Sequence, residues 1–220
     1  METGSEKILE VMEKRVKLED NYNAMKWTVE AGLHTVIQLV IGMPGESPDT
    51  IGDTIEFTKT CMSLSLDQNP NWLSINYAQA LPGTPLYEFG RHKGLVGRTI
   101  DEEEEYLDQI SDRNAHDEFA TINYTDFPRL VQHSWRPLIQ LSVNHHYVQK
   151  YGMAHYHRIL NRDMGRIGGV NNDRGFFAQP QKSFDVSMVS GENKTTDGVF
   201  WIGDRDGVPA LTKLMFQRRF

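Results

Sequence analysis

The chain has 220 residues and a net charge of −7, and its 39% hydrophobic and 24% charged residues are typical of a soluble globular protein. The acidic balance disfavours non-specific nucleic-acid binding, which needs many Lys and Arg residues to neutralise phosphates. No window approaches the ~18 uninterrupted apolar residues of a membrane-spanning helix, and the N-terminus lacks the regions of a signal peptide, so we expect a cytoplasmic protein.

Hydrophobic periodicity predicts alternating helices and strands over the first part of the chain. The predicted helices cover residues 6–15, 20–31, 50–60 and 86–93, and the predicted strands cover residues 35–41 and 72–79. The nearly continuous apolar residues of the first strand favour a parallel strand covered on both faces. Strands separated by helices predict crossover connections and a parallel sheet, so the expected fold class is α/β.

The character of the chain changes after about residue 97. Helices are predicted over residues 99–110, 127–147 and 156–160, and strand-like pieces at residues 184–189 and 198–202. The face expected to be buried in the second of these helices comprises Leu130, Val131, Trp135, Leu138, Ile139 and Val143. We therefore predict a first domain of residues 1–97 and an extension of residues 98–220, helical to about residue 160 and then irregular.

The most informative motif follows the first predicted strand. Gly42-Met43-Pro44-Gly45-Glu46-Ser47 joins that strand to the next helix, and its glycines allow positive φ and close approach of a ligand. The helix N-terminus beyond it offers N–H groups to an anion. The alternative is a tight turn in which Glu46 is only a favourable charge near the start of a helix.

Two further segments are expected beside this turn. Leu81-Pro82-Gly83-Thr84-Pro85-Leu86-Tyr87 follows the second predicted strand, and the carboxyl ends of parallel strands lie at one edge of a sheet. Glu2-Thr3-Gly4-Ser5 precedes the first helix in the position of another strand end. The sequence thus predicts three strand ends around one ligand.

These segments, in this order, resemble a known family. They are similar to the C-terminal half of the core of radical S-adenosylmethionine (SAM) enzymes, most of all to the group with a cobalamin-binding domain that includes anaerobic magnesium-protoporphyrin ester cyclase-like enzymes. The resemblance covers about residues 1–95. Its further matches are Ile8–Arg15, Ala31-Gly32-Leu33 and Thr54.

The resemblance implies a partial, incomplete (β/α)6 TIM-like barrel. In that family a Cys-x3-Cys-x2-Cys loop holds a [4Fe–4S] cluster, which binds SAM and cleaves it to a 5′-deoxyadenosyl radical. By position, the resemblance assigns SAM contacts to Glu2, Gln38, Gly42, Ala80 and Leu81. It also implies a reductant, a small-molecule substrate and, on the resemblance alone, a cobalamin cofactor for the parent enzyme.

The parts that would carry this chemistry are missing from the chain. Cys61 is its single cysteine, so it can form neither an internal disulfide nor a three-thiolate cluster site. We therefore expect no catalytic residue and no metal ligand here, an inactive chain in isolation, and a buried Cys61. The absence of the first four barrel strands predicts a fragment whose partner is the missing N-terminal half of the same enzyme.

The parent enzyme would perform radical chemistry at an unactivated C–H position, such as methylation or oxidative cyclisation. Two alternatives stay open. One is a non-catalytic α/β subunit or remnant that pairs with a chain supplying the missing strands. The other is an ordinary α/β enzyme that binds an anion at the Gly42–Ser47 turn.

Other patterns are weaker candidates for sites. Five histidines lie close together in the sequence: His133, His145, His146, His155 and His157. His155 and His157 could chelate a metal ion, but His145 and His146 would point about 100° apart on a helix, so we expect solvated histidines at helix ends. The arginines Arg162, Arg166 and Arg174 lie among glycines but fit no phosphate-loop pattern. Asn123 and Asn193 begin formal glycosylation sequons, and the acidic residues 101–105 predict a solvated helix start.

Overall fold

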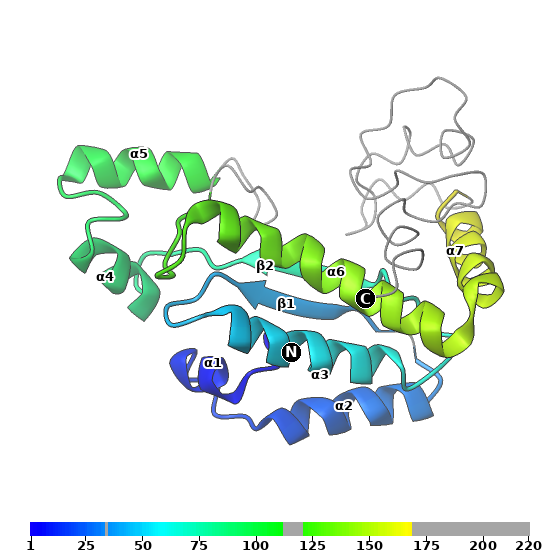
Figure 1. The fold of residues 1–220 in the computed structure, drawn as a ribbon. Coiled ribbons are helices and arrows are strands. Elements are labelled where there is room, and N and C mark those ends of the chain that lie inside the picture. Colours follow the sequence, from blue (N-terminus) through cyan, green and yellow to red (C-terminus); the bar gives the residue numbers. More distant parts are fainter. Residues whose placement is uncertain (34, 112–120, 169–220) are drawn as a thin grey trace. The chain divides into compact units, whose positions relative to one another are not determined.

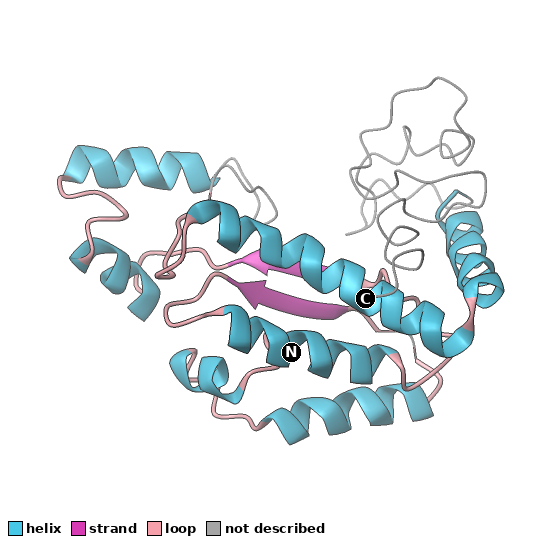
Figure 2. Ribbon diagram, in the orientation of Figure 1, coloured by secondary structure: helices cyan, strands magenta, loops and turns pink. Residues whose placement is uncertain are grey.

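The computed structural model describes residues 1–33, 35–111 and 121–168, with only the backbone of Ser111 and of residues 163–168. The helices are α1 (Glu6–Val11), α2 (Leu18–Glu30), α3 (Pro48–Met62), α4 (Pro85–His92), α5 (Ile100–Ser111), α6 (Arg129–Tyr151) and α7 (Met153–Gly168), and the strands are β1 (Ile37–Ile41) and β2 (Leu73–Tyr77) (Figures 1 and 2). The strand-like pieces predicted at residues 184–189 and 198–202, with Arg174 and Asn193, lie outside the described residues.

Contacts within the chain define two compact units. The first comprises residues 1–61 and 72–140, and the second comprises residues 62–71 and 141–220. Helices α3 and α6 contribute residues to both units. The predicted boundary between sequence domains at residue 97 stays a prediction.

The first unit is built on a parallel pair of strands, as the sequence predicts. Ile37 lies opposite Leu73 and Ile41 opposite Tyr77, and α3 connects the two strands. Alternate residues of a strand direct their backbone groups to opposite edges. The N–H of Ile37 donates a hydrogen bond on the side of β2. The N–H of Val40 faces the other edge and donates to the carbonyl of Glu2 at 2.7 Å. The N-terminal segment therefore lies along the edge of β1 that β2 leaves open.

The two faces of β1 differ in burial. Ile37, Leu39 and Ile41 are buried, but Gln38 is exposed and Val40 is half-buried. The expectation of a strand covered on both faces was therefore wrong for β1. Period-two alternation places Gln38 and Val40 on one face, and in the described part of the chain nothing covers Gln38 fully.

The helices predicted on either side of β1 are present, with shifted ends. Gly32 has φ +69° and follows the last turn of α2, which is the usual role of glycine after a helix. Ser47 precedes Pro48 in the first position of α3, and its hydroxyl accepts the N–H of Thr50 at 3.4 Å. Helix α1 ends earlier than predicted, at Val11, because the chain then turns through positive φ at Glu13 and Arg15.

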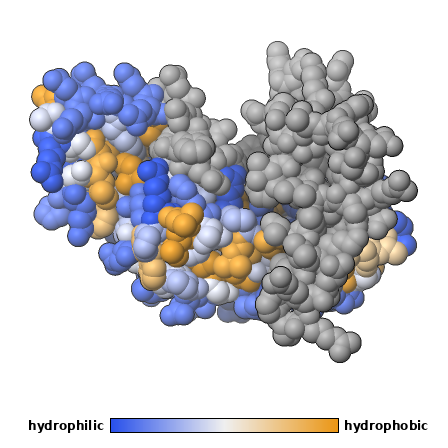
Figure 3. Space-filling model, turned by 45° about the horizontal axis from the view of Figure 1, so that its top comes forward, coloured by the Kyte–Doolittle hydropathy of each residue, from blue (hydrophilic) through white to orange (hydrophobic). Residues whose placement is uncertain are grey.

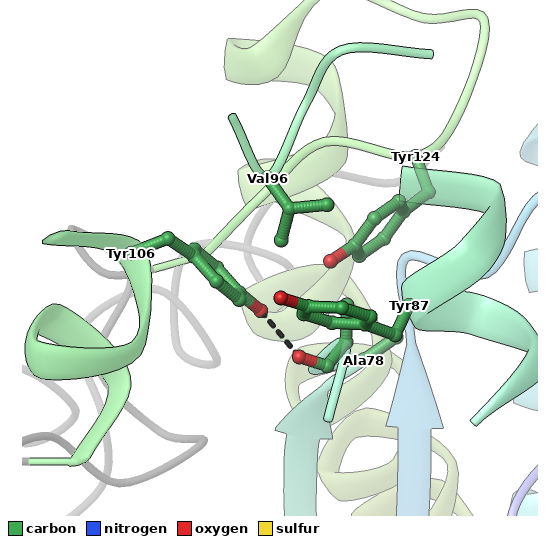
Figure 4. Packing of buried hydrophobic residues seen from close by; sticks show 6 residues of the cluster. Ala78, Tyr87, Val96, Tyr106 and Tyr124 are labelled. Atoms are coloured by element: carbon green, nitrogen blue, oxygen red, sulfur yellow. Dashed lines mark hydrogen bonds between the residues drawn. The ribbon is translucent and has the colours of Figure 1, made fainter. Parts of the chain in front are cut away.

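A tyrosine cluster packs α4 and α5 against the segment that follows β2. Its buried members are Ala78, Ala80, Tyr87, Val96, Tyr106 and Tyr124 (Figure 4). Tyr106 donates its hydroxyl hydrogen to the Ala80 carbonyl at 2.8 Å, and Tyr87 donates to Glu103 at 2.8 Å. Glu103 also forms an ion pair with Arg91. The acidic first turn of α5 is therefore not only solvated, because Glu103 binds two residues of α4.

Helix α6 begins in the first unit, beside β2. Trp135 and Ile139 are buried as predicted, but Leu130 is 82% exposed and Leu138 is 46% exposed, so the predicted buried face was partly wrong. The ring of His133 lies 5.7 Å from the ring of Tyr77, measured between centroids. On the same helix the polar Gln132 is buried, whereas Leu130 is not.

In its described part, the second unit consists of the end of α6, α7 and the loop that follows α3. Gly152, with φ +82°, separates α6 from α7. Helix α7 runs to Gly168, so the expected irregular structure beyond about residue 160 was wrong for residues 161–168. Side chains of both helices donate to the carbonyls of this loop: Tyr147 and His155 to Leu66, Lys150 and Tyr151 to Ser63, and Arg162 to Asp67.

Apolar side chains reach the surface in separate groups among hydrophilic ones (Figure 3). The large apolar side chains with the highest exposed fractions are those of Trp27, Leu33, Ile100 and Leu130. Over residues 1–168, leaving out the gaps, none of the helices combines the length and hydropathy that a bilayer crossing requires.

Candidate functional site at the carboxyl edge of the sheet

The candidate site is the edge at which β1 and β2 end. Ile41 pairs with Tyr77 at the last register position, and the N–H of Ala78 donates to the Ile41 carbonyl at 2.8 Å. Gly42 and Ala78 therefore continue side by side beyond the strands. The first Gly/Pro segment that the sequence singled out begins at Gly42, and the second begins at Leu81, three residues beyond Ala78.

The side chain of Glu46 folds back into the Gly42–Ser47 loop and binds the backbone at the start of that loop. It is 2% exposed, and its Oε2 accepts the N–H of Gly42 in a short hydrogen bond. Burial raises the pKa of Glu46 to about 7, although hydrogen bonds from the N–H groups of Gly42 and Met43 act in the opposite direction. Its Oε1 is buried and has no hydrogen-bond partner in the described part of the chain. Glu46 is thus a buried carboxyl group rather than a surface charge.

This arrangement disfavours an anion cradle at the same loop. The N–H of Gly42 is occupied by the Glu46 carboxylate, and Ser47 donates its N–H to the Thr50 hydroxyl at 2.9 Å. An incoming phosphate would lose these donors and would meet a carboxyl group that ionises near neutral pH. The N–H groups of Gly42 and Ser47 are therefore not available to an anion, and the Glu46 carboxyl group makes the potential at this loop unfavourable for one.

The N-terminal segment is fixed to α3 by close packing. Thr54 accepts the N–H of Gly4 at 3.1 Å and shares a hydrogen bond of 3.0 Å with the Thr3 hydroxyl. A Cβ on Gly4 would lie 2.5 Å from the Cβ of Phe57, so only glycine fits here. Ser5 donates its hydroxyl to Asp53 at 3.0 Å instead of capping α1. These contacts explain the Thr-Gly-Ser sequence structurally.

The remaining residues assigned to SAM by resemblance occupy different environments. Glu2 forms an ion pair of 2.7 Å with Lys14, and Gln38 is exposed on β1. Ala80 is fully buried and its carbonyl already accepts from Tyr106, whereas Leu81 is 49% exposed. Their proposed contacts with SAM stay predictions, and the Ala80 carbonyl would have to bind a ligand in addition to Tyr106.

The site contains a residue that the sequence did not single out. Gln132 of α6 is 1% exposed, and its Nε2 lies 2.5 Å from the position that a Cβ on Gly42 would take. Among the residues that the structure describes, neither its Nε2 nor its Oε1 has a hydrogen-bond partner. The available signal was weak, because a single glutamine between Val131 and His133 in a helix carries no motif.

The weaker candidates are accounted for by packing. Cys61 is fully buried, as predicted, and burial raises the pKa of its thiol to about 12. His155 lies within hydrogen-bond distance of the Leu66 carbonyl, at 2.6 Å. Asn123 of the first sequon binds Thr125 and Phe127 through its side-chain amide. Within the described ranges, no group of three or more His, Cys, Asp or Glu residues could hold a metal ion.

Comparisons with known proteins give one partial similarity. No protein-family model matches the chain. The chain is 30% identical over 96 residues to an uncharacterized methyltransferase of Pyrococcus horikoshii. The match covers 44% of this chain and 19% of that protein. The chain therefore spans about a fifth of the length of this relative.

Proposed function

We propose that this chain is the C-terminal part of the core of a radical SAM enzyme, whose carboxyl sheet edge forms part of the wall around the adenosyl group. The observation that carries the proposal is the hydrogen bond between Val40 and Glu2. Because of this bond, Glu2-Thr3-Gly4-Ser5 begins beside β1. β1 in turn leads into the Gly42–Ser47 loop, so these segments of the resemblance are neighbours in space. A parallel βαβ unit with Gly/Pro loops at one edge is the expected setting for such a ligand.

The residues present fit SAM and its cluster differently. Gly42, with φ +86°, lies beside the unpartnered amide of Gln132, which is a setting suited to polar ligand atoms. The cluster does not fit: Cys61 is buried with a raised pKa, whereas a cluster ligand must be an accessible thiolate. Any [4Fe–4S] cluster must therefore be held by residues outside this chain, and we derive no step through it.

The reaction class of the parent enzyme is part of the same proposal. The relative of Pyrococcus horikoshii is named a methyltransferase, and methylation at an unactivated carbon is one reaction of the proposed class. Oxidative cyclisation is another, and cobalamin dependence follows only from the resemblance. The contribution of this chain would be to bind and orient the adenosyl group and to help exclude water at the sheet edge.

The DNA upstream of Met1 tests the proposal. We expect a continuous reading frame that encodes a strand ending beside Glu2 and, further upstream, a Cys-x3-Cys-x2-Cys loop. A long upstream frame without the three cysteines would refute the proposal. A promoter and ribosome-binding site directly before Met1 would instead support a separate subunit that pairs with another chain.

A further inference from the structure

A cavity of about 570 Å³ opens to the surface where α4 ends and α5 begins. Every side chain that lines it is polar, and the rest of its lining is two glycines. Pockets for apolar ligands are lined mainly by hydrophobic and aromatic side chains, so this cavity suits a small and highly charged ligand. The side chains are those of Glu88, Arg91, His92, Lys93, Arg98 and Glu103.

The two carboxylates of the cavity are already paired with one arginine. Nε of Arg91 lies 2.9 Å from Oε1 of Glu103, and its Nη1 lies 3.3 Å from Oε2 of Glu88. The other oxygen of Glu103 accepts the hydroxyl hydrogen of Tyr87 at 2.8 Å. Both carboxylates are therefore committed to neighbouring side chains, and neither is ion-paired with a second cation of the lining.

The cations of Lys93 and Arg98 are in excess at this cavity. In the part of the chain that the structure describes, neither forms an ion pair, and the ammonium group of Lys93 lies 5.8 Å from the centroid of the Phe89 ring. Three cations and two carboxylates line the cavity, so its formal charge is +1, whereas the whole chain carries −7. A local positive potential in an acidic protein attracts anions.

The backbone allows the Arg98 guanidinium to lie at the cavity. Gly94 has φ +67°, and a Cβ on it would lie 2.9 Å from Nε of Arg98. The guanidinium therefore lies against the Gly94 backbone, in space that a larger residue would take. Gly97, with φ +115°, also lines the cavity. Glycine lets a ligand approach the main chain closely.

Backbone groups at the helix ends are already bound to the protein. The free carbonyls at the end of a helix carry partial negative charge, which repels anions. In the last turn of α4, three carbonyls accept the N–H groups of Lys93, Gly94 and Leu95. At the start of α5, Oε2 of Glu102 accepts two N–H groups. Recognition of a ligand in this cavity therefore rests on the side chains.

We propose that this cavity binds a phosphate group of a small polyanionic ligand through Lys93 and Arg98, with His92 as a further hydrogen-bonding group. A phosphate monoester carries a charge of about −1.5 to −2 near neutral pH, which matches two cations better than a single carboxylate does. Arginine binds phosphate oxygens through paired N–H groups, and lysine binds them as a point charge. The cavity is separate from the carboxyl edge of the sheet, so this inference does not depend on the proposed function.

Isothermal titration calorimetry of the 220-residue chain with inorganic pyrophosphate, at physiological ionic strength, tests the inference. We expect binding at millimolar concentration or below. Arg98→Gln and Lys93→Gln should each weaken it about fivefold, the upper value for an exposed charge pair, and the double variant should show no measurable binding. Lys26→Gln removes the same charge from an exposed position of α2, should leave the binding unchanged, and is the matched control.

A thermal melt separates lost binding from a lost fold. Lys93 and Arg98 are exposed, so without pyrophosphate their variants should melt at the temperature of the wild type. Pyrophosphate should raise the melting temperature of the wild type and of Lys26→Gln, but not that of the double variant. In the wild type itself, pyrophosphate should shift the amide NMR signals of Gly94 and Gly97.

Four results would overturn the inference. They are no pyrophosphate binding at millimolar concentration, equal weakening by Lys26→Gln, and amide shifts confined to other parts of the chain. The fourth is tighter binding of a hexaglutamate peptide than of pyrophosphate, which would show that the cavity takes an acidic peptide instead of a phosphate group.

Discussion

The buried carboxyl group of Glu46 makes the stability of this chain depend on pH in a specific way. Its pKa is raised by burial from 4.5 to about 7. The folded chain thus holds this proton more tightly than the unfolded chain. The corresponding stabilisation is fully present below about pH 4.5 and is lost as the pH rises through about 7. The difference corresponds to about 3 kcal/mol of unfolding free energy, as an order of magnitude.

The variant Glu46→Gln removes the ionisation and keeps an oxygen that can accept the N–H of Gly42. Relative to the wild type, we expect its unfolding free energy to rise by about 3 kcal/mol between pH 5 and pH 8. Urea denaturation followed by circular dichroism at several pH values measures this difference. Glu10→Gln, at an exposed position of α1, is the control and should show no such trend.

A flat difference between Glu46→Gln and the wild type from pH 5 to pH 8 would refute the reasoning. It would mean that the carboxyl group is hydrated in the folded chain. The loop could then no longer be described as closed by a buried Glu46. A difference with the opposite sign, in which the variant loses stability as the pH rises, would show that the ionised carboxylate stabilises the fold.

Three further predictions concern packing. Gly4→Ala should lower the unfolding free energy by about 1–3 kcal/mol in urea titrations, because its Cβ would lie 2.5 Å from the Cβ of Phe57; unchanged stability would contradict the close packing. Tyr106→Phe should cost about 1–3 kcal/mol, because the buried Ala80 carbonyl loses its donor; a melting temperature equal to that of the wild type would argue against this bond. Cys61 should resist Ellman's reagent in the folded chain and react on unfolding, since its thiol is fully buried; rapid reaction under native conditions would disprove that burial.

Local signals in the sequence predicted the framework of the site. The start of α3 has a local cause, because Ser47, Pro48 and Asp49 are each residue types that favour the N-terminus of a helix. An apolar run predicted the first strand, alternation of residue types predicted the second, and the intervening helix predicted their parallel pairing. These features depend on neighbours in sequence, so they could be predicted without a structure.

The interior of the site depends on contacts between distant positions. In one of the two interpretations of the turn, Glu46 was only a favourable charge near the start of a helix, and nothing local shows that the loop folds its carboxyl group back onto Gly42. Gln132 reaches Gly42 only because α6 packs beside β2 through contacts such as that of His133. The same packing exposes Leu130, which periodicity placed inside. Helical spacing identifies a face, but tertiary packing decides which residues at its margin are buried.

The most direct test of the central proposal is reductive cleavage of SAM. The product of the complete reading frame would be purified anaerobically, reconstituted with iron and sulfide, and incubated with SAM and dithionite. We predict 5′-deoxyadenosine in mass spectrometry for this protein and none for the 220-residue chain alone. A reconstituted protein that binds no cluster, or that holds a cluster and forms no 5′-deoxyadenosine, would contradict the proposal.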